Sequence, residues 1–323
     1  MTTSETIMAV QAVTANDLEE QLKRIRLLAS AATEGVFGPR SVIWRIDREA
    51  AIFLGAGRAL LLQLAHPWIA AAISEHSRTF ADPIGRFHRT FEVVFSLVFG
   101  SLDQAFAAAR RLHRRHSAIY GRLPATAGPF AAGSPYQANE LSALRWVQAT
   151  LTDTAVLVYN LVVGPLPLED REQYYAESKL FAALFGIPPA FLSSNWSAFT
   201  EYNRAMWESD ILTVTSMARI MAQQLLTGGG GTWLRPPQWY GALTAYMLPE
   251  PVRSAFGLRY DAAEQRLAEN ALAWIRRFYP ALPERLRYVG PYQEAKARLV
   301  GKVRPDLSTR LLNRIWIGQP LLP

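Results

Sequence analysis

The stretch DPIGRFHRTFEVVFSLVFGSLDQAFAAARRLHRRHSAIYG, from Asp82 to Gly121, decides the fold because it contains two helices with their start and stop signals. Asp82 is a good N-cap and Pro83 suits the first helical position, so a helix is predicted from Pro83 to about Phe99. Gly100 then fits the left-handed position that often follows a helix. The first half of the stretch is therefore predicted to be one capped helix.

The second half of the stretch has the signals of another helix. Ser101 and Gln104 have the spacing of a capping box, and the helix that they open is predicted to last to Tyr120, with Gly121 closing it. The same signals predict further helices from Asn139 to Gly164, from Asp170 to Gly186, and from Asp261 to before Pro280.

Strand signals are scarce, and no Asn-Gly hairpin signal occurs. The runs Phe95–Phe99 and Val156–Val163 are β-branched enough for strands, but both lie inside longer capped segments, so helix is predicted for each. The sequence therefore predicts an all-α fold.

The 323 residues are expected to form three parts. Residues 1–35 are predicted to be an N-terminal arm, mobile or loosely docked, and residues 36–227 the main helical bundle. The glycines at 228–231 indicate a flexible joint, after which residues 228–323 are predicted to form a smaller helical part packed on the bundle. This packing is expected because the C-terminal part carries large aromatic side chains that need burial: Trp233, Trp239, Tyr240, Tyr246 and Trp274.

Composition excludes several kinds of site and partner. The chain has no cysteine, so it cannot hold disulfides, iron–sulfur clusters, thiolate-ligated haem or thiolate zinc. Its net charge of +7 comes mostly from arginine. No nucleic-acid partner is predicted, because the chain lacks a recognition module and an aromatic-interleaved basic strand.

Neither a signal peptide nor a transmembrane helix is predicted. The first twenty residues are polar and mixed in charge, and the longest apolar stretch, from Ala59 to Ile73, is interrupted by His66-Pro67. A cytoplasmic location is therefore expected. Peripheral contact with a membrane stays open, since basic side chains could face anionic lipid, and the oligomeric state is left undetermined.

The segment Gly55-Ala56-Gly57 has part of a dinucleotide-binding fingerprint. The third glycine is absent, however, and the preceding residues from Arg48 to Leu54 read as helix instead of strand. Close packing of helices at small residues is the better interpretation.

Only five histidines are available to hold iron or another metal. His113 and His116 lie one turn apart on the predicted helix, on a face shared with Ala109 and Tyr120. A neutral imidazole on a buried helix suits iron, and the small Ala109 leaves room for a planar ring. Ordinary helical histidines are the alternative. His66, at a helix end before Pro67, is either bonded to nearby carbonyls or part of a pocket wall.

Arg86, Arg89 and Thr90 share one face of the helix that begins at Pro83. Two guanidiniums beside apolar side chains are costly to bury without an anionic partner. Haem propionates or an oxygen species could be that partner. A solvated face, or ion pairs with Glu92 or Asp103, is the alternative.

Together the motifs resemble a known family. The segments that carry the resemblance are RALLLQLAHP at 58–67, EHS at 75–77, Asp82-Pro83 with Arg86 and Thr90, the histidine pair, Tyr136, LRWVQATLTD at 144–153, YY at 174–175 and FGIP at 185–188. Over roughly residues 40–260, the chain resembles the family that joins the bacterial rubber oxygenases (latex clearing proteins) with the fungal mycophenolic-acid pathway oxygenase.

This resemblance implies a globin-like multi-helix bundle that holds one b-type haem. It implies His116 as the proximal iron ligand with His113 beside it, although both face the same way and either could bind the iron. Arg86, Arg89 and Thr90 are implied on the distal side, and Arg86 and His66 are expected among the haem contacts. Rubber-cleaving relatives have lysine at the position of Arg89, and arginine is a poor iron ligand because it stays protonated.

The sequence therefore predicts a haem b-dependent oxygenase that adds dioxygen to an apolar, unsaturated, isoprenoid- or lipid-like small molecule. Two alternatives stay open: a haem carrier or gas sensor without turnover, and a helical scaffold that has lost the cofactor. The fold and the haem are expected to carry over from the family more readily than the substrate does.

Overall fold

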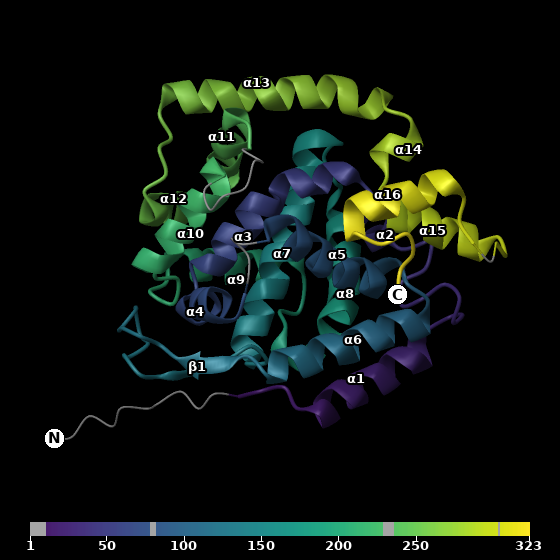
Figure 1. The fold of residues 1–323 in the computed structure, drawn as a ribbon, viewed down its shortest axis with the longest axis horizontal. Helices are drawn as coiled ribbons and strands as arrows, with labels where there is room; N and C mark the ends of the chain where they lie inside the picture. Colours follow the sequence, from purple (N-terminus) through teal and green to yellow (C-terminus); the bar gives the residue numbers. More distant parts are fainter. Residues whose placement is uncertain (1–10, 78–81, 229–235, 303) are drawn as a thin grey trace.

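The computed structural model describes residues 11–77, 82–228, 236–302 and 304–323. These residues are mostly helical and contain one small two-stranded sheet, which confirms the all-α prediction (Figure 1). The first half of the chain forms α1 (Ala15–Leu28), α2 (Val42–Asp47), the 3-10 helix η1 (Ala50–Gly55), α3 (Ala56–Leu64), α4 (Pro67–His76), α5 (Pro83–Phe99), α6 (Leu102–Ser117), β1 (Tyr120–Arg122), β2 (Pro135–Gln137) and α7 (Leu141–Val162). The second half forms α8 (Leu168–Ala183), η2 (Pro189–Phe191), α9 (Trp196–Glu208), α10 (Ser216–Thr227), α11 (Gln238–Met247), α12 (Glu250–Phe256), α13 (Ala262–Phe278), η3 (Tyr279–Ala281), α14 (Glu284–Arg287), α15 (Gly290–Leu299) and α16 (Leu307–Ile317).

Helix α5 has the predicted limits, and Asp82 caps it by accepting a hydrogen bond from Gly85 N. Gly100, however, is extended (φ −65°, ψ 163°), so the predicted left-handed conformation is wrong. The reason is that the next residue, Ser101, is already the N-cap of α6, where an N-cap needs β-region geometry. The chain thus passes from one helix to the next without a left-handed residue.

Helix α6 begins with the predicted capping box but ends at Ser117, so its predicted extension to Tyr120 is wrong. Tyr120 belongs instead to β1, which pairs antiparallel with β2. Asn139 supports this early end, because its Nδ2 donates to the carbonyl oxygen of His113 at 3.2 Å and to Ser117 Oγ at 3.0 Å. The predicted helix start at Asn139 is therefore displaced, and Glu140 caps α7.

Helix α8 starts at Leu168, directly after Pro167, and Asp170 lies in its first turn instead of at its N-cap. Helix α13 follows its prediction closely, because the Asp261 carboxylate accepts hydrogen bonds from Ala263 N and Glu264 N.

Helix α7 runs through the middle of the molecule and packs on α3 (Figure 1). Trp146 Nε1 donates to the carbonyl oxygen of Leu62 at 2.9 Å, and Gln63 Nε2 donates to Thr150 Oγ1 at 3.1 Å. The sequence segments 58–67 and 144–153 are therefore side by side and bonded to each other in the core.

The glycines at 55 and 57 lie at close contacts between helices, as predicted. A Cβ at Gly55 would overlap the methyl group of Thr154 on α7, and a Cβ at Gly57 would lie 2.6 Å from Thr244 Oγ1 on α11. Gly57 N also donates to the Tyr240 hydroxyl at 2.9 Å. These contacts confirm the packing interpretation of the segment.

The N-terminal helix α1 buries Leu18, Leu22 and Ile25 in the main core. Of the predicted joint at 228–231, only Gly228 lies within the described residues, where it ends α10 in the left-handed conformation. The division of the chain at residues 35 and 227 stays a prediction.

Helix α13 lies across one end of the molecule, over α11 (Figure 1). Trp239, Tyr240 and Tyr246 are partly buried beneath it, but Trp274 is 66% exposed, so the expected burial of this tryptophan is wrong. The inner face of α13 is filled by smaller side chains, and Trp274 lies on the opposite face. Trp233 is outside the described residues.

In the part of the chain that the structure describes, no single helix has the length and apolar composition to cross a bilayer. One bent pair of segments, Ala50–Leu64 with Pro67–His76 at 106°, reaches these limits when taken together.

Candidate functional site

The candidate site lies where α5 begins and α6 ends. These two helices pack against each other, and β1, which follows α6, contacts α4. Arg115 of α6 is close enough to lower the pKa of both Arg86 on α5 and His116 on α6. The fold thus brings Arg86 of α5 near Arg115 in the last turn of α6, the turn that also carries His116.

His116 is partly buried in the last turn of α6. Burial is the largest cause that lowers its pKa, to about 4, and the positive charges of Arg115 and His113 act in the same direction, while a hydrogen bond with Asn139 opposes them. The imidazole is therefore neutral at pH 7, and a neutral imidazole carries the lone pair that a metal ligand needs.

His113 lies one turn earlier, and its ring already forms a hydrogen bond. Its Nε2 is 3.0 Å from the carbonyl oxygen of Val13, so this nitrogen carries the proton and donates. The N-terminal segment before α1 is thereby attached to α6. A metal at this nitrogen would have to displace Val13.

Arg86 is partly buried, and its Nη1 donates to the hydroxyl of Ser77. Its pKa is lowered to about 10, mainly by burial, and the nearby positive charges of Arg115 and Arg89 act in the same direction. No carboxylate within the described ranges forms an ion pair with this guanidinium. Arg86 is therefore a partly desolvated cation whose hydrogen-bond partner among the described residues is a neutral hydroxyl.

Arg89 and Thr90 are both exposed. Arg89 Nη1 lies 3.0 Å from Asp82 Oδ2, which is the N-cap of the same helix, while Glu92 and Asp103 pair with other arginines. The structure therefore does not place Arg89 and Thr90 beside His116, and the suggested pairing with Glu92 or Asp103 does not occur for Arg89. Their catalytic roles stay predictions.

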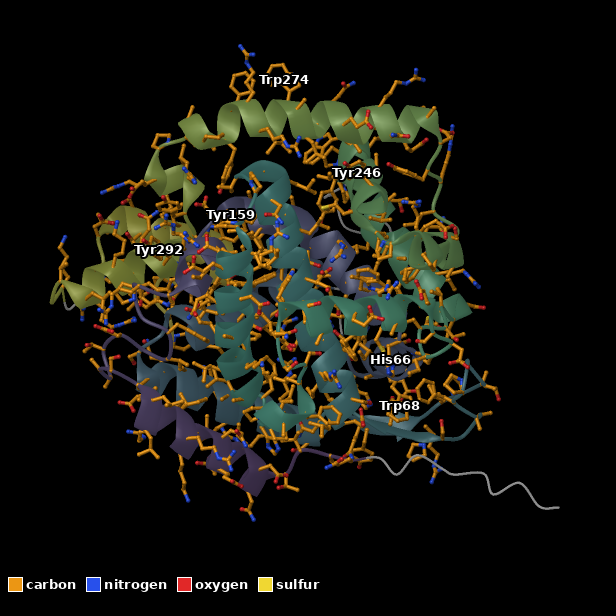
Figure 2. All side chains as sticks on the ribbon, turned by 180° about the vertical axis from the view of Figure 1, so that it is seen from behind. His66, Trp68, Tyr159, Tyr246, Trp274 and Tyr292 are labelled. Atoms are coloured by element: carbon orange, nitrogen blue, oxygen red, sulfur yellow. The ribbon has the colours of Figure 1, made fainter. Side chains whose placement is uncertain are left out.

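His66 is the most deeply buried of the candidate residues, with 2% of its surface exposed. It is the N-cap of α4, and its Nδ1 accepts a hydrogen bond from Trp68 N at 3.3 Å. Its ring lies 5.4 Å from the Phe130 ring and 5.8 Å from the Trp68 ring, and Figure 2 shows His66 and Trp68 close together. This histidine therefore ends one helix and starts the next inside an aromatic cluster.

Acid is expected to destabilise the protein through His66. Burial lowers the pKa of its imidazole from 6.5 to about 4, so the unfolded chain binds a proton that the folded chain does not bind between these values. The free energy of unfolding should therefore fall as the pH drops below 6.5, by about 3 kcal/mol for this residue when pH 4 is reached.

Urea unfolding at pH 7 and at pH 4 measures this loss, with the variant His66→Asn as the matched control. Asparagine keeps an acceptor for Trp68 N but does not titrate. The variant should lose less stability on acidification than the wild-type protein. Equal losses in the two proteins would show that His66 is already protonated or solvated in the fold.

Sequence reasoning missed a set of polar residues at the end of α4. The Tyr136 hydroxyl donates to Glu75 Oε2, which together with burial raises the pKa of Tyr136. His76 Nε2 is 3.1 Å from the carbonyl oxygen of Tyr120, and Ser77 accepts from Arg86. The segment Glu75-His76-Ser77 thus forms hydrogen bonds with β1, β2 and α5. From the sequence alone, this segment contributes only to the family resemblance.

Two pockets of about 180 and 380 Å³ lie among other residues, the first beside Val13 and Leu141 and the second beside Arg45, Arg48 and Tyr292. Within the described residues, no group of three or more histidine, aspartate or glutamate side chains could hold a metal ion. A metal held only by protein side chains is therefore not indicated. Haem iron differs, because its porphyrin supplies four ligands and the chain needs to supply only one.

A comparison with protein-family models matches residues 44–277 to a model described as the catalytic domain of the ER-bound oxygenase mpaB/B′ and rubber oxygenase. The match begins in α2, ends in α13 and includes every candidate residue from His66 to His116. Searches of curated proteins and of solved structures found no match.

Proposed function

We propose that this chain, which belongs to the mpaB/B′ and rubber oxygenase catalytic-domain family, is a haem b-dependent oxygenase that adds dioxygen to an apolar, unsaturated, isoprenoid- or lipid-like molecule. Membership of the family makes it an oxygenase domain. That the chain binds haem b, and that it acts on this class of substrate, is what we propose. The observation that supports the haem is the neutral, partly buried imidazole of His116 in the last turn of α6, beside Arg115, which in turn lies near Arg86.

The residues present fit a haem. His116 is neutral and partly buried, so it would hold the haem iron through its lone pair. His113 is the less suitable of the two, because its Nε2 already donates to Val13 O. His113 would instead attach the N-terminal segment to the helix that carries the ligand.

Arg86 would supply positive charge to the site. A partly desolvated guanidinium that has no carboxylate partner among the described residues stabilises an anion more strongly than one in water does. That anion would be a propionate of the haem, or the negative charge that develops on the reacting oxygen. Arg89 would act indirectly, because its bond to Asp82 holds the first turn of α5, which carries Arg86.

When bound, the haem would supply the iron that activates dioxygen. The chain would contribute the imidazole of His116 as iron ligand, hydrogen-bond donors and surroundings that exclude water. The buried ring cluster of His66, Trp68 and Phe130 would exclude water on the side of α4. Thr90 faces solvent, and a role for it stays a prediction.

Oxygen uptake by the haem-supplied protein tests this proposal. We expect uptake, and new carbonyl products, with an unsaturated isoprenoid such as squalene, and no uptake with its saturated counterpart squalane. Bound haem without uptake on any unsaturated isoprenoid or lipid would favour a carrier or gas sensor. Protein that binds no haem would contradict the proposal and leave a helical scaffold.

A further inference from the structure

The outer face of α13 carries two large aromatic side chains that the fold does not cover. Trp274 is 66% exposed and Phe278 is 47% exposed, and their rings are stacked with centroids 4.7 Å apart. Figure 2 shows Trp274 pointing away from the body of the molecule. Single exposed apolar residues are common on protein surfaces, but a stacked tryptophan–phenylalanine pair exposes far more apolar area at one place.

Helix α13 packs on the rest of the molecule through its other face. Its inner face buries Ala268 and Leu272, and Leu272 packs in a cluster with Leu243 of α11 and Val158 of α7. Leu267 lies two turns before Trp274 on the outer side and is also exposed. The helix is therefore apolar on its covered side and also along part of its uncovered side.

The same segment is basic. Residues 262–287 contain five arginines and three glutamates. Glu264 and Glu284 pair with Arg259 and Lys296, and Arg285 and Arg287 pair with Asp306 and Glu49, all outside this segment. Among the described residues, three arginines and one glutamate of the segment therefore form no ion pair. Arg266 and Arg277 are exposed, Arg266 about two turns before Trp274, and the Arg277 guanidinium is 6.0 Å from the Phe278 ring centroid.

The apolar surface continues beyond α13 along the chain. Leu282 and Leu286 are both exposed, and Arg285 lies between them. Aromatic rings that alternate with arginines are typical of segments that lie in the interface of a bilayer. There the rings reach the boundary between headgroups and acyl chains, while guanidiniums bind lipid phosphates.

We propose that the outer face of α13 docks on an anionic lipid bilayer, with Trp274 and Phe278 entering the headgroup region and Arg266 and Arg277 binding lipid phosphates. An anionic surface is complementary to this segment and to the net charge of +7 of the chain. The inference goes beyond the proposed oxygenase activity and does not depend on it. It would bring the protein to the phase in which apolar molecules accumulate.

Co-sedimentation of the full chain with lipid vesicles tests this proposal without any turnover. The probes are vesicles of phosphatidylcholine alone and of phosphatidylcholine with phosphatidylserine. The wild-type protein should bind the anionic vesicles, and added salt should weaken the binding. The double variant Trp274→Ser/Phe278→Ser should bind at least about tenfold more weakly. Arg266→Gln and Arg277→Gln should each weaken binding about fivefold.

The matched control is Leu311→Ser/Ile315→Ser, which removes two equally exposed apolar side chains (60% and 58%) from α16. This control should bind vesicles like the wild-type protein. Circular dichroism checks that each variant is folded, and brominated lipids that quench tryptophan fluorescence give a second readout in the wild-type protein.

Three results would overturn the proposal. The first is that the wild-type protein does not bind anionic vesicles. The second is that the α16 control loses as much vesicle binding as the α13 double variant. The third is that light scattering shows a wild-type dimer that the α13 double substitution dissociates. The last result would identify this face as a contact between protein chains.

Discussion

Replacing Asp153 by alanine is expected to lower the free energy of unfolding by about 3–5 kcal/mol. Arg58 is buried, and its Nη2 lies 2.6 Å from Asp153 Oδ2. Two more of its donors bind Thr154 Oγ1 at 2.6 Å and the carbonyl oxygen of Met247 at 2.8 Å. The guanidinium therefore cannot turn to solvent when the carboxylate is removed, and its charge stays buried without compensation.

Urea unfolding, followed by circular dichroism, measures this loss. In the double variant Arg58→Met/Asp153→Ala, part of the stability should return, because removing both charges leaves no buried ion. The variant Glu201→Ala, which breaks the exposed pair of Glu201 with Arg204, should cost far less, since water screens that pair. A small effect of Asp153→Ala would mean that Arg58 reaches water.

The second large effect is expected on activity. His116→Gly should reduce haem-dependent oxygen uptake by more than about a hundredfold, since losing only the hydrogen-bond partner of a metal ligand commonly costs 10- to 100-fold. Free imidazole added to this variant should restore part of the uptake, because it can occupy the space left by the side chain. A merely structural histidine would not show this rescue.

His113→Gly is the matched control one turn away. It removes the bond to Val13 but leaves His116 in place, so it should retain oxygen uptake and show no dependence on imidazole. If His113→Gly loses uptake and regains it with imidazole while His116→Gly does not, the two histidines have the opposite roles.

Local signals predicted the helices well where the partners of the capping residue are all close to it in the sequence. Asp82 and Asp261 cap α5 and α13 as expected, because each lies next to the backbone N–H groups that it serves. Asn139 did not start α7, because its amide binds His113 O and Ser117 Oγ, which are more than twenty residues away in the sequence. Such a long-range partner cannot be read from local spacing.

The candidate site could likewise be predicted only in part from local patterns. The order of motifs suggested that Arg86 and His116 act at one site; Arg86 lies near Arg115, the neighbour of His116 in the sequence, and a shared site stays a prediction. The helix face shared by Arg86, Arg89 and Thr90 suggested a common role, but only Arg86 is partly buried. Helix periodicity gives the direction of a side chain, whereas burial depends on what the rest of the chain packs against it.

Trp274 shows that composition alone does not predict which aromatic side chains are buried. A large aromatic residue was expected inside, yet α13 covers the core with Ala268 and Leu272 and leaves the ring outside. Which side of an amphipathic helix faces inward depends on its neighbours, here α11 and α7. The exposed ring became informative only when the structure showed its surroundings.

Visible absorption during titration of the purified protein with haem tests the central claim most directly. We expect the wild-type protein and His113→Ala to bind one haem per chain with the same Soret band, and His116→Ala to lose the haem or to shift that band. A His116→Ala protein with the haem content and Soret position of the wild type would contradict the assignment of His116 as the iron ligand.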